Sequence, residues 1–518
     1  MDFQVIFTTA RSFVLELLED NVYYNSDKYE IVINGERYME SEKVIQTVYG
    51  LTPDTAYQVA VRRDGQVSET REVRTRYEYV TLNVRDFGAK GDGVSDDTAY
   101  LQAAIMSCPQ NSRVLVPRGV YRFTNLFLKS DLTIELAEGA ELKAIPDKTR
   151  LAVLPGRIQS YDEKGEYLIA SWEGNPLESF ASILTGIQVK NVVICGRGSI
   201  DGSADFDNWW NVEKRKGDPA RPKMMFLNNC ENVVLQGVTI KNSPCWNMHP
   251  CFSRDLRFLD ITIQSPADSH NTDGIDPESC ENVEIAGVYF SVGDDCIAIK
   301  SGKMYMGKKY KTPSKHIVVR NCYMNKGHGA VTIGSEISGG VDDIQIRNCV
   351  FYHTDRGLRV KTRRGRGKDS VLRGITFDNI KMEYVRSAFV INSFYYCGTD
   401  GKTEYVSSKK PLSVDERTPS VKDVHIRNVE CIGTHVAGVY FYGLPEQKIE
   451  QVEMENVRIT YAEDARPGTA AMMQGCEITC RKGIFARNIN KLTMKNVVIE
   501  GCEGEPLDIE EVDEVIRG

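Results

Sequence analysis

Asn191-Val192-Val193-Ile194 is the first clear copy of a phrase, one turn residue followed by three mostly apolar residues, that recurs along the chain. Most successive copies lie roughly 23 to 41 residues apart, and each is followed by Gly or Asn and a second short apolar stretch. The other copies are Asn232-Val233-Val234-Leu235, Asp255-Leu256-Arg257-Phe258, Asn282-Val283-Glu284-Ile285, His316-Ile317-Val318-Val319, Asp343-Ile344-Gln345-Ile346, Asp423-Val424-His425-Ile426 and Val452-Glu453-Met454-Glu455.

A repeat of this kind, with short strands and no helices, cannot bury its apolar face alone, so its copies must stack. Leucine-rich repeats would show Leu at fixed positions and a helix in each unit, and a β-propeller would need longer blades of four strands. The sequence shows neither pattern. We therefore predict an all-β chain dominated by a parallel β-helix in which each copy of the phrase forms one coil.

One helix is expected at the start of this solenoid. The stretch Phe87–Thr98 is rich in Gly and Asp and leads into Ala99–Ile105, a short amphipathic segment with Ser and Asp available to cap it. Such a helix would plug the open end of the solenoid and shield its edge strands.

The first 79 residues differ from the repeats. Short alternating strands are predicted at Phe3–Ile6, Phe13–Leu17 and Tyr29–Ile33. Leu51–Val61 resembles the tyrosine-corner strand of fibronectin type III domains, in which a Tyr follows a Pro-containing turn and its hydroxyl bonds back to nearby backbone. We predict a small fibronectin type III-like β-sandwich over residues 1–79 and the β-helix over residues 80–518. The sandwich offers no acid–base or metal constellation, so we expect a spacer or shield.

Composition supports a large folded protein with two domains. The chain has 518 residues, 41% hydrophobic and 26% charged, with a net charge of −8. No segment is basic enough overall to predict nucleic-acid binding. No run of about 18 apolar residues predicts a membrane span. Basic clusters inside an acidic chain therefore matter more than the total charge, and the sequence carries no signal for an oligomeric state.

The cysteines and the N-terminus bear on the compartment. Several of the 14 cysteines fall in a recurring Asn-Cys step (Cys230, Cys322 and Cys349), which suits small buried thiols in stacked turns better than disulfides. Met1–Ile6 lacks the basic and apolar regions of a signal peptide. We therefore expect a reduced compartment, the cytoplasm, unless a signal was removed before the numbering begins.

Three acidic residues share the register of the repeat: Asp273 and, about one bare coil later, Asp294 and Asp295. Stacked coils lie about 4.8 Å apart, so these carboxylates should lie on neighbouring rungs of one face. Carboxylates this close cannot all ionise freely, so the pKa of at least one should rise toward that of a useful general acid. At further coil spacings, with insertions, the same face should carry His249, His328, Arg359 and Lys361.

A structural interpretation competes with a catalytic one. Asn, Asp and Gly are routine at β-helix turns, where Asp caps backbone donors, and a lone Asp-Asp is most often structural. Single His residues are likewise mostly uninvolved in chemistry. The common register of all these motifs favours the catalytic interpretation.

These motifs resemble the blocks of the pectin-degrading glycoside hydrolases that include polygalacturonases, family 28. The blocks stand as Asn271-Thr272-Asp273, Gly293-Asp294-Asp295, Gly327-His328-Gly329 and Arg359-Val360-Lys361, with Val360 where Ile is commoner. The resemblance covers roughly residues 80 to 500. It implies a right-handed β-helix, inversion at the anomeric carbon and a polyanionic galacturonan substrate, the only partner we expect.

The resemblance also implies roles for the acidic trio. Asp294 is expected to protonate the leaving oxygen, while Asp273 and Asp295 hold and deprotonate the attacking water. Inversion typically places the two carboxyl groups about 6.5–9.5 Å apart, which leaves room for that water.

The remaining site residues are expected to tune the acid or bind substrate. His328 should hydrogen-bond the acid or the sugar. Arg359 and Lys361 should bind the substrate carboxylate, for which a guanidinium fork is well shaped. Further substrate-binding positions are predicted at His249, Lys300, Arg364 and Arg366.

The basic run Lys361–Lys368 lacks the Gly-Lys-Ser/Thr of a phosphate loop, so we expect it to extend the anion-binding cleft. It resembles a stretch found in exo-acting members of the family. Two apparent insertions, around 151–178 and 395–418, are placed where they can wall off one end of the groove. We therefore expect exo-polygalacturonase activity.

Other interpretations remain open. A rhamnogalacturonan-type hydrolase would use the same machinery. A pectate or pectin lyase would need calcium and an Arg or Lys base, and a glycan-binding β-helix would have no reason to keep the acidic trio. No cluster has the His/Cys spacing of a zinc site, so we predict no metal and no cofactor. Sugar stacking and core packing are equally compatible with Trp209, Trp210 and Trp246.

Overall fold

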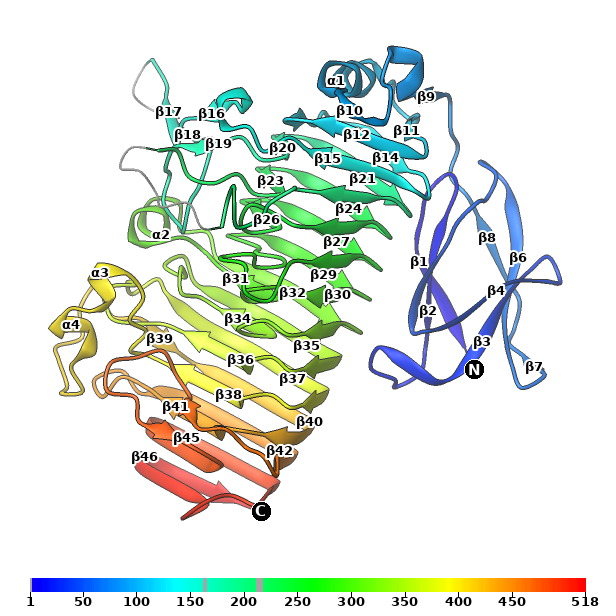
Figure 1. Cartoon of the computed structure of the whole chain (residues 1–518). Coiled ribbons are helices and arrows are strands. Elements are labelled where there is room, and N and C mark those ends of the chain that lie inside the picture. The colour runs from blue at the N-terminus through cyan, green and yellow to red at the C-terminus, as the bar shows by residue number, and fades with distance from the viewer. Residues whose placement is uncertain (1, 162–164, 211–217) are drawn as a thin grey trace.

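The computed structural model describes residues 2–161, 165–210 and 218–518. Strands predominate, and a single sheet system of 28 strands winds through most of the chain (Figure 1). Successive coils pair in parallel, which confirms the predicted all-β fold and its right-handed parallel β-helix. Three faces, here called the first, second and third sheets, follow one another around each coil.

The eight quoted phrases all lie on the first sheet, where each copy pairs in parallel with a neighbouring coil. The strands confined to this sheet are β9 (Thr81–Asn83), β11 (Arg113–Val116), β14 (Leu132–Leu136), β21 (Lys190–Gly196), β24 (Glu231–Gln236), β27 (Arg254–Leu259), β29 (Glu281–Ala286), β32 (Ser314–Arg320) and β39 (Ser420–Val421).

The second sheet follows after one residue with positive φ, such as Gly237 (φ 74°) or Gly287 (φ 69°). This turn explains why Gly or Asn follows each phrase. The strands that belong to the second sheet alone are β10 (Asp92–Asp96), β12 (Gly119–Phe123), β15 (Ala140–Ala144), β22 (Ser199–Asp201), β25 (Thr239–Lys241), β28 (Thr262–Gln264), β30 (Tyr289–Ser291) and β33 (Tyr323–Asn325).

Toward the C-terminus the first two sheets are continued by long strands that span both. These are β35 (Val341–Tyr352), β37 (Val371–Glu383), β40 (Asp423–Thr434), β42 (Ile449–Tyr461) and β45 (Lys482–Glu500), while the last strand, β46 (Leu507–Arg517), joins the third and first sheets.

The third sheet carries the functional face. Its separate strands are β13 (Leu126–Phe127), β20 (Leu184–Ile187), β23 (Met225–Asn228), β26 (Met248–Cys251), β31 (Ile297–Ile299), β34 (Val331–Ile333), β36 (Arg356–Lys361), β38 (Ser387–Asn392) and β41 (Ala437–Tyr442). The first residues of β45 and β46 continue it. Ile275 bridges β26 to β31, so the stack continues through the middle of the molecule.

Aliphatic and aromatic side chains from all three sheets fill the interior of the solenoid. The thiols of Cys230, Cys322 and Cys349 are buried there, and all 14 cysteines are free, as the Asn-Cys step predicted. Helix α1 (Thr98–Ser107) buries Leu101, Ala104 and Ile105 against the first coils, which confirms the predicted end plug. The 3₁₀ turn η1 (Val84–Phe87) lies beside it.

The N-terminal residues form two antiparallel sheets that share one core. One sheet holds β1 (Phe3–Thr8), β2 (Phe13–Leu17) and β5 (Ile45–Val48). The other holds β3 (Tyr24–Ile33), β4 (Glu36–Lys43), β6 (Ala56–Arg63), β7 (Gln66–Val67) and β8 (Arg71–Arg74). The Tyr57 hydroxyl accepts a hydrogen bond from the Thr52 backbone N–H at 2.9 Å, the bond expected of a tyrosine corner. The likeness to fibronectin type III domains stays a prediction.

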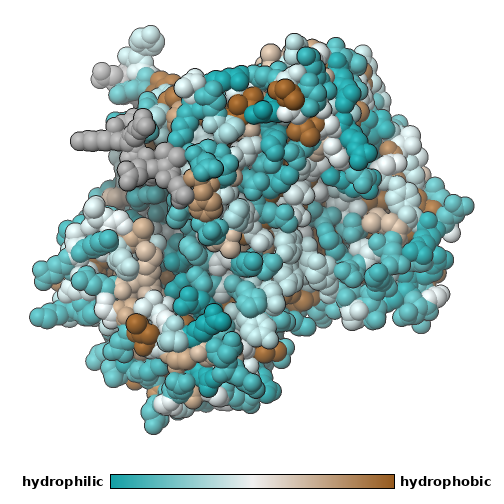
Figure 2. All heavy atoms as spheres, viewed as in Figure 1, coloured by the Kyte–Doolittle hydropathy of each residue, from teal (hydrophilic) through white to brown (hydrophobic). Residues whose placement is uncertain are grey.

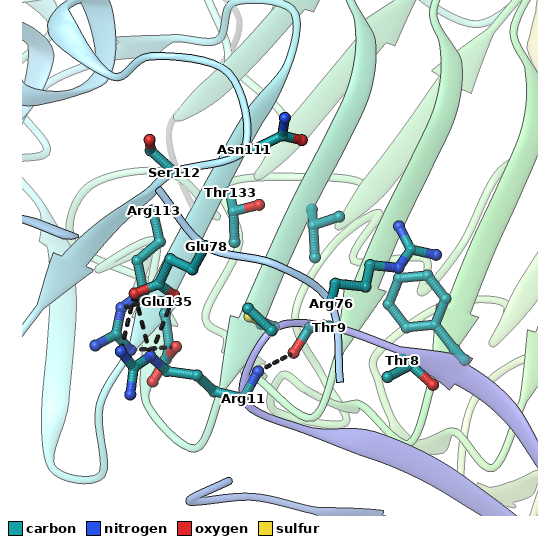
Figure 3. A pocket seen from close by; sticks show the side chains of 14 residues that line it. Thr8, Thr9, Arg11, Arg76, Glu78, Asn111, Ser112, Arg113, Thr133 and Glu135 are labelled. Carbon is teal, nitrogen blue, oxygen red and sulfur yellow. Dashed lines mark hydrogen bonds and ion pairs between the residues drawn. The ribbon is translucent and has the colours of Figure 1, made fainter. Parts of the chain in front are cut away.

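This sandwich is packed onto the first sheet rather than held off as a spacer, which corrects one of the two roles expected for it. Its core includes Val234, Leu259 and Ala286 of the β-helix. Glu16 pairs with the buried guanidinium of Arg320, and Lys43 Nζ lies 2.8 Å from Asp260 Oδ1. A small hollow of about 60 Å³ at the junction is lined by charged side chains, including Arg11, Glu78, Arg113 and Glu135 (Figure 3).

The outer surface is largely hydrophilic on the face shown in Figure 2, with hydrophobic residues scattered over it. No helix within the described ranges is long and apolar enough to cross a membrane. Shorter elements decorate the solenoid: η2 (Lys148–Arg150), β16 (Val153–Leu154), β17 (Arg157–Gln159), β18 (Glu166–Leu168), β19 (Ser179–Phe180), α2 (Met304–Tyr310), α3 (Gly398–Gly401), α4 (Glu404–Ser407), β43 (Gly468–Thr469) and β44 (Ile478–Thr479).

Candidate active site

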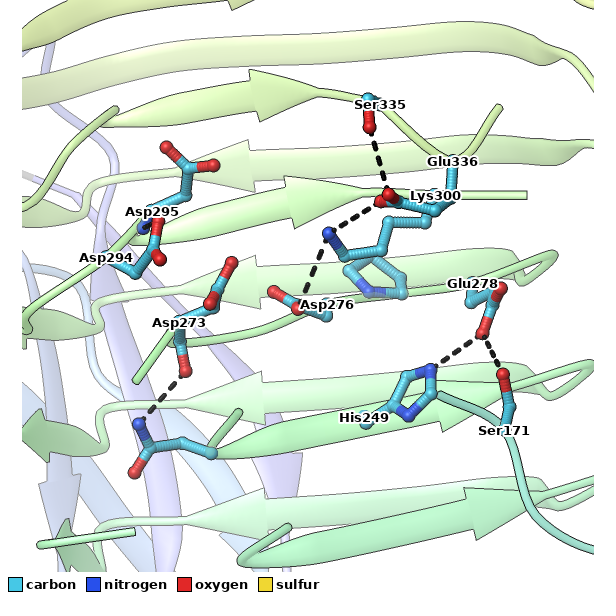
Figure 4. Close-up of polar contacts among 12 residues, drawn as sticks. Ser171, His249, Asp273, Asp276, Glu278, Asp294, Asp295, Lys300, Ser335 and Glu336 are labelled. Carbon is cyan, nitrogen blue, oxygen red and sulfur yellow. Dashed lines mark hydrogen bonds and ion pairs between the residues drawn. The ribbon is translucent and has the colours of Figure 1, made fainter. Parts of the chain in front are cut away.

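The turns that lead into the third sheet bring the acidic trio together. Ile297 of β31 pairs with Val331 of β34, so the turns that carry Asp294 and His328 lie on adjacent rungs. Asp273 lies one rung earlier, just before Ile275. Figure 4 shows the three aspartates near one another on neighbouring rungs. The register inferred from the repeat therefore places these residues correctly.

The trio is tighter than expected. One carboxylate oxygen from each of Asp273, Asp294 and Asp295 lies within 4.8 Å of the others. These nearest-oxygen distances are shorter than the separation of about 6.5–9.5 Å expected for inversion, because neighbouring rungs and adjacent residues of one turn supply all three groups. The side chain of Asp294 is 20% exposed and that of Asp295 is buried. Asp294 is thus the member open to a leaving group.

Asp273 is the member of the trio whose carboxyl pKa rises. Burial raises it well above its usual range, and the negative charges of Asp276 and Asp294 raise it further. Its Oδ1 is buried and without a hydrogen-bond partner among the described residues. A raised pKa within this cluster is what the crowding of carboxylates predicted.

Asp295 is held ionised. Arg359 Nη1 lies 2.9 Å from its Oδ1 and Lys361 Nζ lies 2.8 Å from its Oδ2. Burial alone would raise the pKa of Asp295, but the charges of Lys361 and Arg359 hold it well below its usual range. Both cations were expected to bind the substrate carboxylate. Their contacts instead stabilise Asp295, although Lys361 also lines the cleft.

His328 lies where the sequence placed it, beside the predicted acid. Its Nδ1 is 3.2 Å from Asp294 Oδ1, and the ring is 50% exposed. This hydrogen bond is the main cause of the raised pKa of His328. The histidine can therefore hold the Asp294 carboxyl in position.

Lys300 contributes a buried positive charge to the floor of the cleft. Its Nζ lies 3.2 Å from Glu336 Oε2 and 3.8 Å from Asp276 Oδ2, and 4.5 Å from the centre of the Trp246 ring. Sequence reasoning missed Asp276 and Glu336. Their one signal was position, since Asp276 stands three residues after Asp273 and Glu336 stands three residues after the end of β34.

His249 does not reach the cleft, which corrects its predicted role in substrate binding. The residue is fully buried, and its Nε2 lies 2.8 Å from Glu278 Oε2. Burial lowers the pKa of His249 to about 4. Ser171 donates to the same Glu278 oxygen at 3.1 Å, so the pair anchors the insertion 151–178 to the β-helix.

Of the two arginines of the basic run that were predicted to bind substrate, one makes structural contacts and the other lines the cleft. Arg364 is wrong as a substrate-binding residue, because it is buried and its donors go to Glu446 and to the carbonyls of Tyr405, Ser408 and Lys410. Arg366 does line the cleft, with Nη2 3.1 Å from Ser335 Oγ.

The cleft encloses about 120 Å³ and is lined by both insertions. Glu173 comes from the first insertion, and Tyr395, Cys397 and Asp400 come from the second. Lys300, Lys303, Lys361, Arg363 and Arg366 surround the carboxylates with positive charge. Trp246 also lines it, whereas Trp209 and Trp210 pack in a core beside Leu151.

Among the residues that the structure describes, two groups have the residue types of a metal site: His249, Cys251 and Glu278, and the acidic trio itself. The first is buried and already joined by the His249–Glu278 hydrogen bond. The second is flanked by Arg359 and Lys361, which neutralise Asp295. The expectation that no metal takes part stays a prediction.

Comparisons with known proteins agree with this geometry. Residues 111–480 match the family described as "Glycosyl hydrolases family 28", and residues 81–135 match "Rhamnogalacturonase A/epimerase, pectate lyase-like". A "Probable polygalacturonase" of Vitis vinifera is 30% identical over 75% of this chain and 77% of its own length. An "Exo-poly-alpha-D-galacturonosidase" of Dickeya chrysanthemi is 28% identical over 74% of this chain and 69% of its own length.

Solved structures show the same architecture. The family 28 exopolygalacturonase of Yersinia enterocolitica superposes with a TM-score of 0.72 at 21% identity, covering 99% of this chain and 98% of that one. A hyperthermoactive exopolygalacturonase from Thermotoga maritima superposes with a TM-score of 0.62 at 26% identity, covering 82% of this chain and 92% of that one. With the acidic trio in the turns that lead into the third sheet of a parallel β-helix, and with a family match over most of its length, this chain belongs to the glycosyl hydrolases of family 28.

Proposed function

We propose that this enzyme cleaves α-1,4-galacturonosyl linkages from a chain end, as an exo-polygalacturonase acting by single-displacement inversion. The observation that carries the proposal is the cleft itself, in which an acidic trio is ringed by lysines and arginines and walled by both insertions. Positive charge fits a substrate with a carboxylate on every sugar. The names of the Dickeya chrysanthemi and Thermotoga maritima relatives support the exo mode.

The contacts assign each carboxylate a task. Asp294, partly exposed and bonded to His328, donates a proton to the leaving oxygen. Asp295, ionised between Arg359 and Lys361, accepts a proton from a water held between it and Asp273. Because both oxygens of Asp295 are engaged by cations, this carboxylate is better suited to polarise water than to attack carbon, which supports inversion over a covalent intermediate.

The test is incubation with galacturonate oligomers of defined length. An exo enzyme with a closed subsite releases mono- or digalacturonate of uniform length from the first minutes, while polymer viscosity falls slowly. NMR of the first product should show the β-anomer, since inversion reverses the α-linkage. A ladder of intermediate oligomers with collapsing viscosity would instead establish endo cleavage, and unsaturated ends would establish a lyase.

A rhamnogalacturonan-type hydrolase is the second candidate, favoured by the match of residues 81–135 to the rhamnogalacturonase description. Parallel digests of galacturonan and rhamnogalacturonan backbones distinguish the two. Faster release from the alternating polymer would overturn the assignment of plain galacturonan.

A further inference from the structure

A second hollow follows the catalytic rungs toward the C-terminal end. It encloses about 520 Å³, and its lining includes His353, Tyr384, Arg386, His435 and Arg466. These residues precede third-sheet strands or follow β42, in the turns equivalent to the one that carries Asp294. It shares no lining residue with the catalytic cleft.

Strand register connects the hollow to the catalytic centre. Val331 pairs with Leu358, and Arg356 pairs with Ser387, so His328, Asp355 and Arg386 occupy equivalent turn positions on three successive rungs. Asp355 N–H donates to the carbonyl of Gly327 at 2.9 Å, which places this rung directly after His328. From Asp294 to Arg386 is therefore three rungs, about 14 Å.

The hollow has the chemistry of a saccharide site. The rings of His353 and Tyr384 stack with centroids 5.1 Å apart and planes 13° apart, and Tyr384 is 42% exposed. Such a platform suits the apolar face of a sugar. Asp464, on the same rim, can accept hydrogen bonds from hydroxyl groups.

Two arginines supply positive charge beside this platform. Arg386 is half-exposed, with Nη1 4.0 Å from Asp355 Oδ1. Arg466 is exposed and has no carboxylate within 4.0 Å among the described residues. Burial lowers the pKa of His435, and Arg466 and Arg386 lower it further against the opposite effect of Asp464. A guanidinium without a partner is well suited to bind a carboxylate.

We propose that this hollow is a distal subsite for a uronate unit of the substrate chain, beyond the bond that is cut. The inference rests on the proposed function and extends it. The insertion 151–178 precedes the catalytic rungs in the solenoid and reaches the cleft through Glu173, whereas the hollow lies on the rungs that follow. The second insertion follows the carboxyl end of β38, whereas the hollow lies in the turns before β36, β38 and β41. A chain whose end is enclosed by the first insertion can therefore extend over Tyr384, Arg386 and Arg466.

The test measures kcat/KM for Arg466→Gln and for the double variant Arg386→Gln, Arg466→Gln on galacturonate oligomers from two to eight units. For the wild type, kcat/KM should rise with length once the distal subsite is filled. The double variant should lose about tenfold on the longest oligomers and nothing on the dimer. The difference in kcat/KM between the wild type and the double variant on the longest oligomers should shrink at high salt. Arg466→Lys should restore part of the loss.

Arg373→Gln is the matched control, because Arg373 is an exposed arginine of β37 on the first sheet, paired with Asp342 away from both hollows. Equal losses on the dimer and the long oligomers, or an effect of Arg373→Gln as large as that of the double variant, would overturn the distal subsite. If the wild type hydrolyses no galacturonate oligomer of any length, it is the proposed function that fails.

Discussion

Asp295 is the carboxylate whose charge depends most directly on its neighbours. Arg359 and Lys361 each contact one of its oxygens, at 2.9 and 2.8 Å, and its side chain is wholly buried. A buried carboxylate that loses one of two cations becomes easier to protonate. The proposed catalytic base is thus kept ionised by residues that the sequence alone assigned to the substrate.

Lys361→Met should shift the acid side of the pH–rate profile. Lys361 and Arg359 lower the pKa of Asp295, so removing one of them raises that pKa, and the base is lost at a higher pH than in the wild type. The acid limb of kcat/KM should move upward by about one pH unit or more, while the variant stays folded. Lys303→Met, which also changes a lysine of the cleft, is the control. An unchanged acid limb would show that Lys361 serves the substrate only.

Asp294→Asn should leave the fold intact and remove nearly all turnover, because an amide cannot deliver the proton to the leaving oxygen. General acid catalysis is commonly worth about 10²–10⁴-fold, and a loss of that size in kcat is expected. Circular dichroism and the thermal midpoint check the fold. Retention of more than about a tenth of the wild-type rate would disprove the assignment of Asp294.

At the scale of the elements, the first residue of most phrases holds the turn into the first sheet. Asn191, Asn232 and Asn282 have φ of 57°, 55° and 56°. Asn232 Nδ2 also donates to Asn191 Oδ1 at 2.8 Å, so neighbouring rungs are joined by a ladder of amides outside the core. Asn tolerates this left-handed backbone better than other residues that carry a Cβ, apart from Asp.

Asn232→Ala should therefore lower the free energy of unfolding by about 1–2 kcal/mol. Ala cannot form the hydrogen bond to Asn191, and its Cβ makes the left-handed backbone conformation unfavourable. Asn232→Gly loses the same hydrogen bond but adopts positive φ freely, so it should cost less than Ala. Urea denaturation of the two variants measures the difference. If Ala and Gly are equally destabilising, backbone conformation is not the reason for Asn at this position.

For the whole molecule, the packing of the sandwich on the first sheet is the contact between domains on which stability is expected to depend. Removing residues 1–79 would expose Val234, Leu259 and Ala286 and leave Arg320 without Glu16. None of the residues lining the cleft belongs to the sandwich. We therefore expect the domain to contribute to stability rather than to the chemistry.

A chain of residues 80–518 should hydrolyse substrate at nearly the wild-type rate per folded molecule but unfold at a lower temperature. The loss of stability follows from newly exposed apolar surface and from the loss of the Glu16–Arg320 and Lys43–Asp260 ion pairs, although Arg320 keeps its contact with Glu284. Active-site titration with thermal denaturation separates the two effects. A truncated protein that is as stable as the full chain would show that the contacts are incidental, and one that is folded but inactive would show that the sandwich shapes the site.

Local repetition allowed much of this structure to be predicted. The phrase that starts at Asn191 specifies an apolar strand, a left-handed turn residue and another strand, and stacking is the one way to bury such units. The same periodicity places Asp273, Asp294 and His328 on adjacent rungs, so the acidic trio could be located without any structure. Repeats are predictable because each coil contacts only its neighbours.

The sequence by itself thus determined the solenoid, its end plug, the register of the candidate catalytic residues and the family. Tertiary structure alone decided which partner each charged side chain meets. Arg364 and Arg366 lie two positions apart in one basic run. Arg364 donates its hydrogen bonds to Glu446 and backbone carbonyls, whereas Arg366 lines the cleft. His249 keeps the repeat register but points into a buried pair with Glu278. Insertions fold outside the repeat, and the direction and partners of a long polar side chain depend on contacts between segments distant in sequence, which periodicity does not encode.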